Sequence, residues 1–211
     1  MVSLVKQIML VKDMCLKNKI VFSYFFLMIF FLFPDKVYSN TNDKFALINY
    51  LESLQNFSAS FLQNDGESLS EGKIYIGKKR VRAEYLKPVK ILIILDENKA
   101  MYYNYELEED EFFNPKNTNA WFFYDIFRNP LFFEDANINL KDKQLTLEKY
   151  SFDMDDSKYF IKIYFENDPL VLRKVEVQNN EESLTITIFN HNYNEELNSD
   201  LFKLINPKLL N

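Results

Sequence analysis

The chain has 211 residues, 47% of them hydrophobic and 17% aromatic, and a formal net charge of −6 at pH 7. A chain with this much apolar side-chain surface buries enough of it to fold, which excludes an intrinsically disordered protein. The acidic balance argues against nucleic acid as a partner, because nucleic-acid-binding domains carry a basic surface.

An apolar run at residues 20–33 is the first feature along the chain. Lys17 and Lys19 precede this run, and Ser39 follows it at a position that suits a signal peptidase. The run is shorter than a membrane-spanning helix and matches the core of a signal peptide. The sequence therefore predicts export to the periplasm with cleavage near Ser39, and an uncleaved N-terminal anchor is the alternative.

The predicted leader divides the chain into an N-terminal extension with signal peptide, residues 1–39, and a single domain, residues 40–211. The leader holds five lysines and two aspartates, so the net charge of the remaining domain is −9. Its front is long for a signal peptide, which makes Met14 an alternative start. The only cysteine, Cys15, precedes the apolar run, so the domain has no disulfide and no thiolate metal ligand.

Residues 41–55 are predicted to form a helix that covers a sheet. Phe45, Ile48, Leu51 and Leu54 recur along it at helical spacing, which gives one apolar stripe.

The following segments alternate apolar and polar side chains, the pattern of strands with one buried face. This alternation covers residues 57–63 and most of 71–113, interrupted by Pro88 and by the polar turn 96–99. Four or five strands in the second range leave no room for crossover helices, so we expect an antiparallel meander. Residues 91–95 are apolar on both faces, which predicts cover on both sides.

Residues 120–128 are the most unusual segment of the predicted domain, because they are apolar on nearly every side and contain the only tryptophan, Trp121. Such a helix is either buried or in contact with something other than water. Two interpretations stay open: burial between sheet layers, and a lid that lines a ligand cavity.

The second half of the chain repeats the strand pattern over residues 145–152, 159–165, 171–177 and 184–188. About ten strands with two helices favour a mainly β fold: a strongly curved antiparallel sheet, or incomplete β-barrel, with helices covering its concave face. Strands of this number enclose more volume than their own side chains fill, so we expect a hollow.

The groups needed for most catalytic and metal chemistry are absent from the sequence. The only histidine, His191, lies between two asparagines in an expected solvated turn, and three glycines form no phosphate-binding or nucleophile motif. The acidic runs 108–111 and 153–156 are interpreted as solvated turns. We therefore expect no enzyme activity, no catalytic residue, no metal site and no cofactor.

Four stretches carry recognisable motifs in a fixed order. Residues 58–63 end in F-x-Q, residues 71–72 open a strand with Glu-Gly, residues 80–88 form a strand that ends in Tyr and Pro, and residues 201–207 close with F-x-x-x-x-P. Together, over residues 45–207, they resemble the LolA-type family of periplasmic outer-membrane lipoprotein carriers.

The chain departs from this family at the lid latch. The family has an Arg-Pro pair before the aromatic strand, and its arginine is linked to lid closure. Gly77 and Lys78 occupy that position here, and Ala83 replaces the usual aromatic residue. Arg80 is our candidate replacement for the latch; Lys78 and Lys79 are alternatives, although lysine and arginine are not equivalent donors.

The resemblance implies a chaperone that shields the acyl chains of lipoproteins in a hydrophobic cavity and carries them from the inner to the outer membrane. The implied partners are acylated lipoproteins, an inner-membrane lipoprotein-releasing ABC transporter and an outer-membrane acceptor, and the expected state is a monomer. Non-directional apolar contacts suit acyl chains of varied length. The predicted lipid-contacting residues, from the lid and the strands, are Phe61, Val81, Tyr85, Ile91, Met101, Trp121, Phe122, Ile126 and Phe127.

Other classes remain as alternatives. A periplasmic sensor or scaffold of the same half-barrel fold would bind lipid or a protein domain without transport. A hydrolase is disfavoured because the sequence lacks a nucleophile–base pair. A lipid-anchored acceptor is disfavoured because Asn40, and not cysteine, follows the leader.

Overall fold

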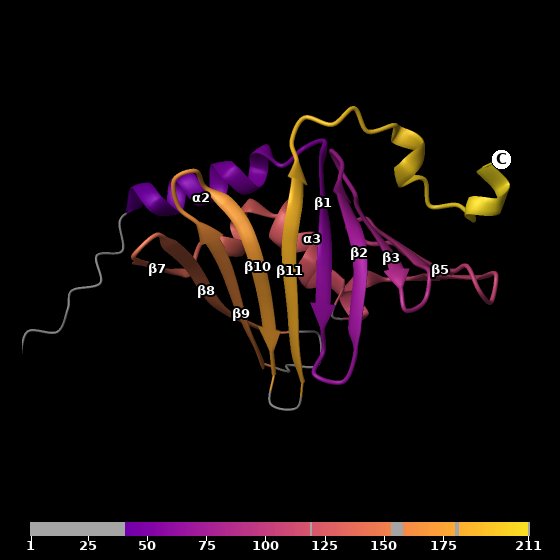
Figure 1. The fold of residues 1–211 in the computed structure, drawn as a ribbon, viewed down its shortest axis with the longest axis horizontal. Helices are drawn as coiled ribbons and strands as arrows, with labels where there is room; N and C mark the ends of the chain where they lie inside the picture. The colour runs from indigo at the N-terminus through magenta and orange to yellow at the C-terminus, as the bar shows by residue number, and fades with distance from the viewer. Residues whose placement is uncertain (1–40, 119, 153–157, 180–181, 211) are drawn as a thin grey trace, which may run out of the picture. The chain divides into compact units, whose positions relative to one another are not determined.

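Eleven antiparallel strands form one open sheet in the computed structural model (Figure 1). The first six are β1 (Phe57–Asn64), β2 (Leu69–Ile76), β3 (Val81–Lys87), β4 (Ile91–Leu95), β5 (Ala100–Asn104) and β6 (Glu109–Phe113). The other five are β7 (Asn137–Lys141), β8 (Gln144–Phe152), β9 (Lys158–Glu166), β10 (Val171–Gln178) and β11 (Ser183–Asn192).

The structure describes residues 41–118, 120–152, 158–179 and 182–210. The predictions for the leader, including Cys15 and cleavage near Ser39, lie outside these ranges, and so does the acidic run 153–156.

The strands follow the order β6-β5-β4-β3-β2-β1-β11-β10-β9-β8-β7, so two meanders join where β1 pairs with β11. The edge strands β6 and β7 do not pair with each other, and the sheet stays open. This confirms the predicted incomplete barrel with helical cover. The strand β7 was not expected from the sequence, because only Ile138 of its five residues is buried and the alternation is weak.

Two α-helices and four short 3-10 helices complete the described domain. Helix α2 (Thr41–Ser53) crosses one end of the sheet and α3 (Ala120–Arg128) lies against its concave face, behind the strands in Figure 1. The 3-10 helices are η1 (Pro115–Asn117), η2 (Pro130–Phe133), η3 (Ser199–Phe202) and η4 (Pro207–Leu210). Helix α2 ends two residues before the predicted Gln55.

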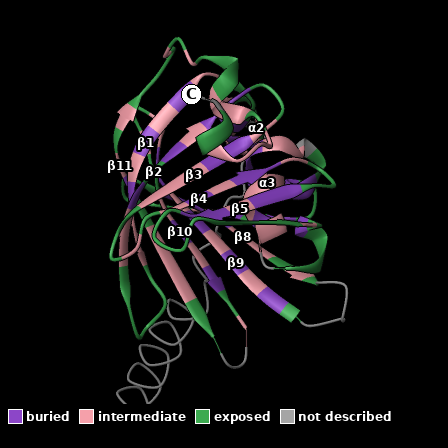
Figure 2. Cartoon of the chain, turned by 90° about the vertical axis from the view of Figure 1, so that its right-hand side faces the viewer, coloured by how far each residue is buried: buried purple, intermediate pink, exposed green. Residues whose placement is uncertain are grey.

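Strand β4 is buried on both faces, as its apolar sequence predicted (Figure 2). Ile93 lies opposite Ala83 of β3 on the concave face, whereas Leu92 and Ile94 lie on the convex face. Met101 of β5 pairs with Ile94 and therefore also lies on the convex face, where it is fully buried. These convex residues, with Tyr103, form a small second core under Leu204.

The C-terminal segment, residues 193–210, covers that second core, and we call it the strap. Arg80 donates from Nη1 to the carbonyl of Phe202 at 2.7 Å, and Arg82 donates from Nη1 to the carbonyl of Leu201 at 2.5 Å. Asn206 donates to Asp110 at 2.8 Å. The strap is thus joined to the sheet by side-chain hydrogen bonds at several points along its length.

Candidate functional site

A cavity of about 210 Å³ lies between α3 and the concave face of the sheet. Its walls are aliphatic and aromatic except for Gln63 and Tyr85. The Tyr85 hydroxyl donates to Gln63 Oε1 at 2.8 Å, so these two polar groups satisfy each other. Burial raises the pKa of Tyr85 to about 12, which keeps its phenol neutral at physiological pH. The cavity therefore offers no charge to a ligand and favours apolar contact.

Small residues on β2 and β3 leave room for this cavity. Ala83 projects toward it between Val81 and Tyr85, where a larger side chain would fill the space. A Cβ atom on Gly72 would lie 2.4 Å from the ring of Phe61 and 2.4 Å from the Glu84 carbonyl oxygen. Glycine at this position thus lets the Phe61 ring lie close over β2, where it meets Tyr85 edge to face.

Helix α3 closes the cavity with Ala120, Phe123 and Phe127, which recur at helical spacing on one side of the helix. Phe122, on a different side, is fully buried against Tyr159, with ring centroids 4.8 Å apart. Trp121 is half-buried beside Phe122. The helix is apolar nearly all round because it serves the cavity and the core at once, so both interpretations of this segment contribute.

The structure brings Phe61, Val81, Tyr85 and Phe127 of the predicted lipid-contacting residues to the cavity wall. Ile91 lies opposite Tyr85 on the same face, although it does not line the cavity. The remaining predicted residues separate into two groups described below.

Phe122, Ile126 and Trp121 belong to the cover but face other parts of the molecule. The placement of Met101 on the wall was wrong, because the register of β5 turns it to the convex face under the strap.

Sequence reasoning missed several cavity residues. On α3 these are Ala120 and Phe123, which the spacing i, i+3, i+7 with Phe127 would have found. On β10 and β11 the wall continues with Val175, Leu184, Ile186 and Ile188. The alternation of β11 predicted their common face, but only the β1–β11 pairing places that face beside Phe61.

Among the described residues, the candidate latch Arg80 forms no hydrogen bond or ion pair with α3. Its Nε donates to Asp96 at 2.6 Å in the β4–β5 turn, and its guanidinium also holds the strap. Partial burial opposes ionisation of Asp96, but hydrogen bonds, above all from Arg80, lower the pKa of its carboxyl group. Its turn position thus directs Arg80 to Asp96 and the strap, and a latch role for Arg80 stays a prediction.

Arg128, the last residue of α3, joins this helix to the segment that follows α2. Its Nη2 donates to the carbonyl of Leu54, just beyond the end of α2, at 2.8 Å. Its Nε is buried without a hydrogen-bond partner among the described residues. Burial lowers the pKa of Arg128, which remains a cation at neutral pH. The position of α3 is thus fastened by an arginine whose hydrogen-bonding capacity is only partly used.

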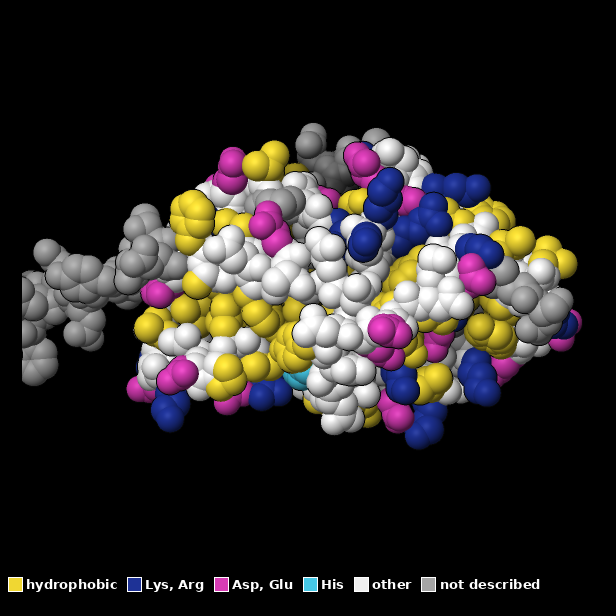
Figure 3. Space-filling model, turned by 90° about the horizontal axis from the view of Figure 1, so that it is seen from above, with side chains coloured by type: hydrophobic (Ala, Val, Ile, Leu, Met, Phe, Trp, Pro, Cys, Tyr) yellow, Lys and Arg dark blue, Asp and Glu magenta, His cyan; other side chains and the backbone are white. Residues whose placement is uncertain are grey.

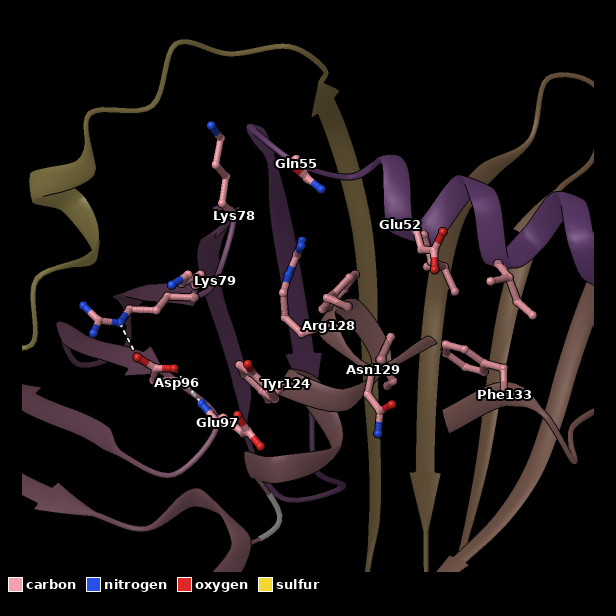
Figure 4. Close-up of a pocket in the computed structure, with 15 residues that line it drawn as sticks. Glu52, Gln55, Lys78, Lys79, Asp96, Glu97, Tyr124, Arg128, Asn129 and Phe133 are labelled. Carbon is pink, nitrogen blue, oxygen red and sulfur yellow. Dashed lines mark hydrogen bonds and ion pairs between the residues drawn. The ribbon is translucent and has the colours of Figure 1, made fainter. Parts of the chain in front are cut away.

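A larger groove of about 710 Å³ opens at the same end of the domain, next to Arg128 (Figure 4). Its floor includes Ile48, Leu51 and Phe133, and charged side chains surround its opening. Phe127 lines both this groove and the cavity. The charged groove and the apolar cavity therefore adjoin each other at this aromatic side chain.

His191 lies within β11 and not in the solvated turn predicted for it. Its Nε2 donates to the carbonyl of Leu172 at 2.6 Å, and its ring stacks on Tyr193. Burial lowers the pKa of His191, so the imidazole is neutral at pH 7. Among the residues the structure describes there is no group of three or more His, Cys, Asp or Glu side chains suited to a metal ion.

A family model described as outer membrane lipoprotein carrier protein LolA matches residues 52–205. The chain belongs to the LolA family. At the level of this family it is a periplasmic, non-enzymatic protein that binds lipid or lipoprotein. Within the described part of this LolA-family chain, no helix has the length and apolarity needed to cross a membrane.

Several solved structures are similar to this chain at low sequence identity. An uncharacterized conserved protein from Thermus thermophilus is 9% identical with a TM-score of 0.52, and the match covers 79% of this chain and 94% of that one. MucB of Pseudomonas aeruginosa, in complex with MucA, is 12% identical with a TM-score of 0.45, covering 76% and 60%. LprF from Mycobacterium bovis is 8% identical with a TM-score of 0.39, covering 72% and 94%. A search of curated proteins found no match.

Proposed function

We propose that this LolA-family chain is a periplasmic chaperone that takes up the acyl chains of lipoproteins between α3 and the concave face and carries them from the inner to the outer membrane. The cavity supports this proposal: its lining is apolar, and its two polar side chains bond to each other. Exposing an acyl chain to water costs about 0.8 kcal/mol of free energy per CH₂, so a carrier needs an apolar lining.

The size of the cavity determines how a ligand would enter. At about 210 Å³ it is smaller than the roughly 300–1,000 Å³ of typical ligand pockets, so an acyl chain requires α3 to move away from the sheet. The rings of Phe123 and Phe127 occupy the space between helix and sheet, and outward movement of α3 would transfer that space to the ligand. Non-directional contacts of this kind re-form with a lipid at little cost.

The proposed partners are acylated lipoproteins as cargo, an inner-membrane ABC transporter that releases them, and an acceptor at the outer membrane. Lipoprotein fractionation tests the transport step. After depletion of the protein, we expect lipoproteins to accumulate in the inner-membrane fraction, and re-expression should restore them to the outer membrane. Normal distribution after depletion would contradict transport and favour a sensor or scaffold.

Native mass spectrometry of the mature protein, purified from a bacterial periplasm, tests the binding step by itself. We expect a population carrying lipid or lipoprotein mass that unfolding removes. A mature protein that never carries such mass would contradict both the carrier and a lipid-binding sensor.

A further inference from the structure

The groove beside the cavity has a positively charged side in an otherwise acidic domain. Lys78 and Lys79 reach it from the β2–β3 turn, and Arg128 reaches it from α3. Within the described ranges none of these three forms an ion pair, whereas Arg80 beside them is matched by Asp96 at 2.6 Å. Figure 3 looks onto this end of the domain and shows Lys and Arg side chains gathered together.

Two further carboxylates, Glu52 and Glu97, also line the groove. Figure 4 shows them on either side of Arg128, Glu52 on α2 and Glu97 beyond Tyr124. Once Asp96 is assigned to Arg80, three cations face two carboxylates, so the groove has a net positive charge while the predicted mature domain has a net charge of −9. A local excess of positive charge attracts anions.

The groove and the apolar cavity adjoin each other at α3. Phe127 lines both the groove and the cavity, and the next residue, Arg128, lines the groove and not the cavity. Lys78 and Arg128 extend toward the same opening (Figure 4). A ligand with an apolar tail past Phe127 would therefore carry its head group among these cations.

We propose that this groove is a head-group subsite for anionic amphiphiles, with a phosphate or carboxylate held by Lys78, Lys79 and Arg128. This inference rests on the proposed function, since the tail of the same ligand occupies the cavity. The Arg128 guanidinium suits such an oxyanion because its planar donors pair with carboxylate and phosphate oxygens, and the two lysines add charge without fixed geometry. The chemical class is an anionic phospholipid or an acidic group close to the lipid anchor of a lipoprotein.

Binding of two lipids with identical acyl chains, phosphatidylglycerol and diacylglycerol, tests the subsite. The mature wild-type protein should bind phosphatidylglycerol more tightly, and K78Q/K79Q should lose about fivefold of that affinity at low salt, as expected for exposed charges. Its affinity for diacylglycerol should not change. The matched control is K141Q/K143Q, which removes the same charge from the β7–β8 turn, at the far edge of the sheet, and should leave both affinities unchanged.

The outcomes separate this inference from the function it rests on. Equal affinity of the wild type for the two lipids, or an equal loss in K78Q/K79Q and K141Q/K143Q, would overturn the head-group subsite and leave the cavity function intact. Failure of the wild type to bind either lipid would overturn both. Inorganic phosphate serves as the competitor: displacement of phosphatidylglycerol only in the wild type and not in K78Q/K79Q supports the subsite, whereas phosphate binding with no effect on lipid affinity would replace it with a site for free anions.

Discussion

The sheet has two covers that are held in different ways. On the convex face, the strap is joined by Arg80, Arg82, Asn206 and an ion pair between Lys208 and Glu108. On the concave face, α3 packs through aromatic and aliphatic side chains, and Arg128 adds a hydrogen bond to the carbonyl of Leu54. The faces beneath both covers are apolar, but the apolar cavity lies only under α3.

This difference shows that an apolar strand face does not by itself identify a binding surface. A cover fastened by hydrogen bonds at several points keeps one position, because each broken bond leaves a polar group to be satisfied. A cover held by apolar contact can move and re-form its contacts with a lipid. The four predictions that follow test this contrast.

The largest effect is expected from filling the cavity. Ala83→Trp places an indole in the space between Tyr85 and α3, and we expect loss of lipid binding by at least about tenfold. The measurement is the binding of a fluorescent fatty acid to the purified protein. Thr187→Trp is the matched control, because Thr187 is exposed between the wall residues Ile186 and Ile188 and therefore points to the other face of β11. Unchanged binding in A83W would place the ligand elsewhere.

A substitution in the convex core should lower stability and leave lipid affinity unchanged. Met101→Ala removes a fully buried side chain under the strap and should lower the free energy of unfolding by about 2–5 kcal/mol. Lipid affinity of the folded protein should stay at the wild-type level. Chemical denaturation and lipid titration measure the two quantities, and Met101→Leu, which keeps the volume, should cost less than about 1.5 kcal/mol. A tenfold loss of lipid affinity in M101A with normal stability would reverse the assignment of the two faces.

Strand faces were predictable where one face of a strand is polar. The alternation in β1 and β3 placed Phe61, Val81 and Tyr85 on one side of the sheet, and the structure brings them to one wall. In β4 both faces are apolar, so its sequence does not tell which residues of the neighbouring strand β5 lie on the concave face. Met101 was misplaced for that reason, since only the register with Ile94 decides it.

The cover was predictable as a helix, but the roles of its side chains were not. A helix that is apolar nearly all round does not reveal whether Phe122 or Phe123 meets the ligand, because its direction relative to the sheet is a tertiary property. The hydrogen-bond partners of the two arginines are likewise decided by the tertiary structure. Arg80 and Arg128 line the same groove, and only the fold shows that Arg80 reaches the strap and Arg128 reaches Leu54.

Alanine substitutions at two glycines, one beside the cavity and one beneath the strap, compare the two covers, with smaller expected effects than the substitutions above. A methyl group on Gly72 would meet the Glu84 backbone and the Phe61 ring at 2.4 Å, so Gly72→Ala should destabilise the fold by about 1–3 kcal/mol and weaken lipid binding as Phe61 shifts. On Gly77 its three nearest atoms would all belong to the Phe202 ring of the strap, at 2.8 to 3.1 Å.

We therefore expect Gly77→Ala to be milder and to leave lipid binding unchanged, because a ring on the strap moves more easily than backbone. Thermal unfolding together with lipid titration distinguishes the two variants. Equal effects on binding would mean that strap and cavity are coupled.

The smallest expected effect concerns the fastening of α3. Arg128→Met removes the hydrogen bond to Leu54, but it also removes the buried Nε that lacks a partner among the described residues, so the free energy of unfolding should change by no more than about 1 kcal/mol. The rate of opening should change more than the stability. Amide hydrogen exchange in α3 should become several-fold faster, because local opening of the helix no longer breaks a charge-assisted bond.

Arg80→Met is the control for the fastening of α3, since Arg80 bonds Asp96 and the strap and forms no hydrogen bond or ion pair with α3 within the described residues. It should accelerate exchange near residues 199–204 and leave α3 unaffected. If R80M and not R128M accelerated exchange in α3, the movements of the strap and of α3 would be coupled. The contrast between a fixed convex cover and a movable concave one would then fail, and with it the reason for expecting a ligand under α3 alone.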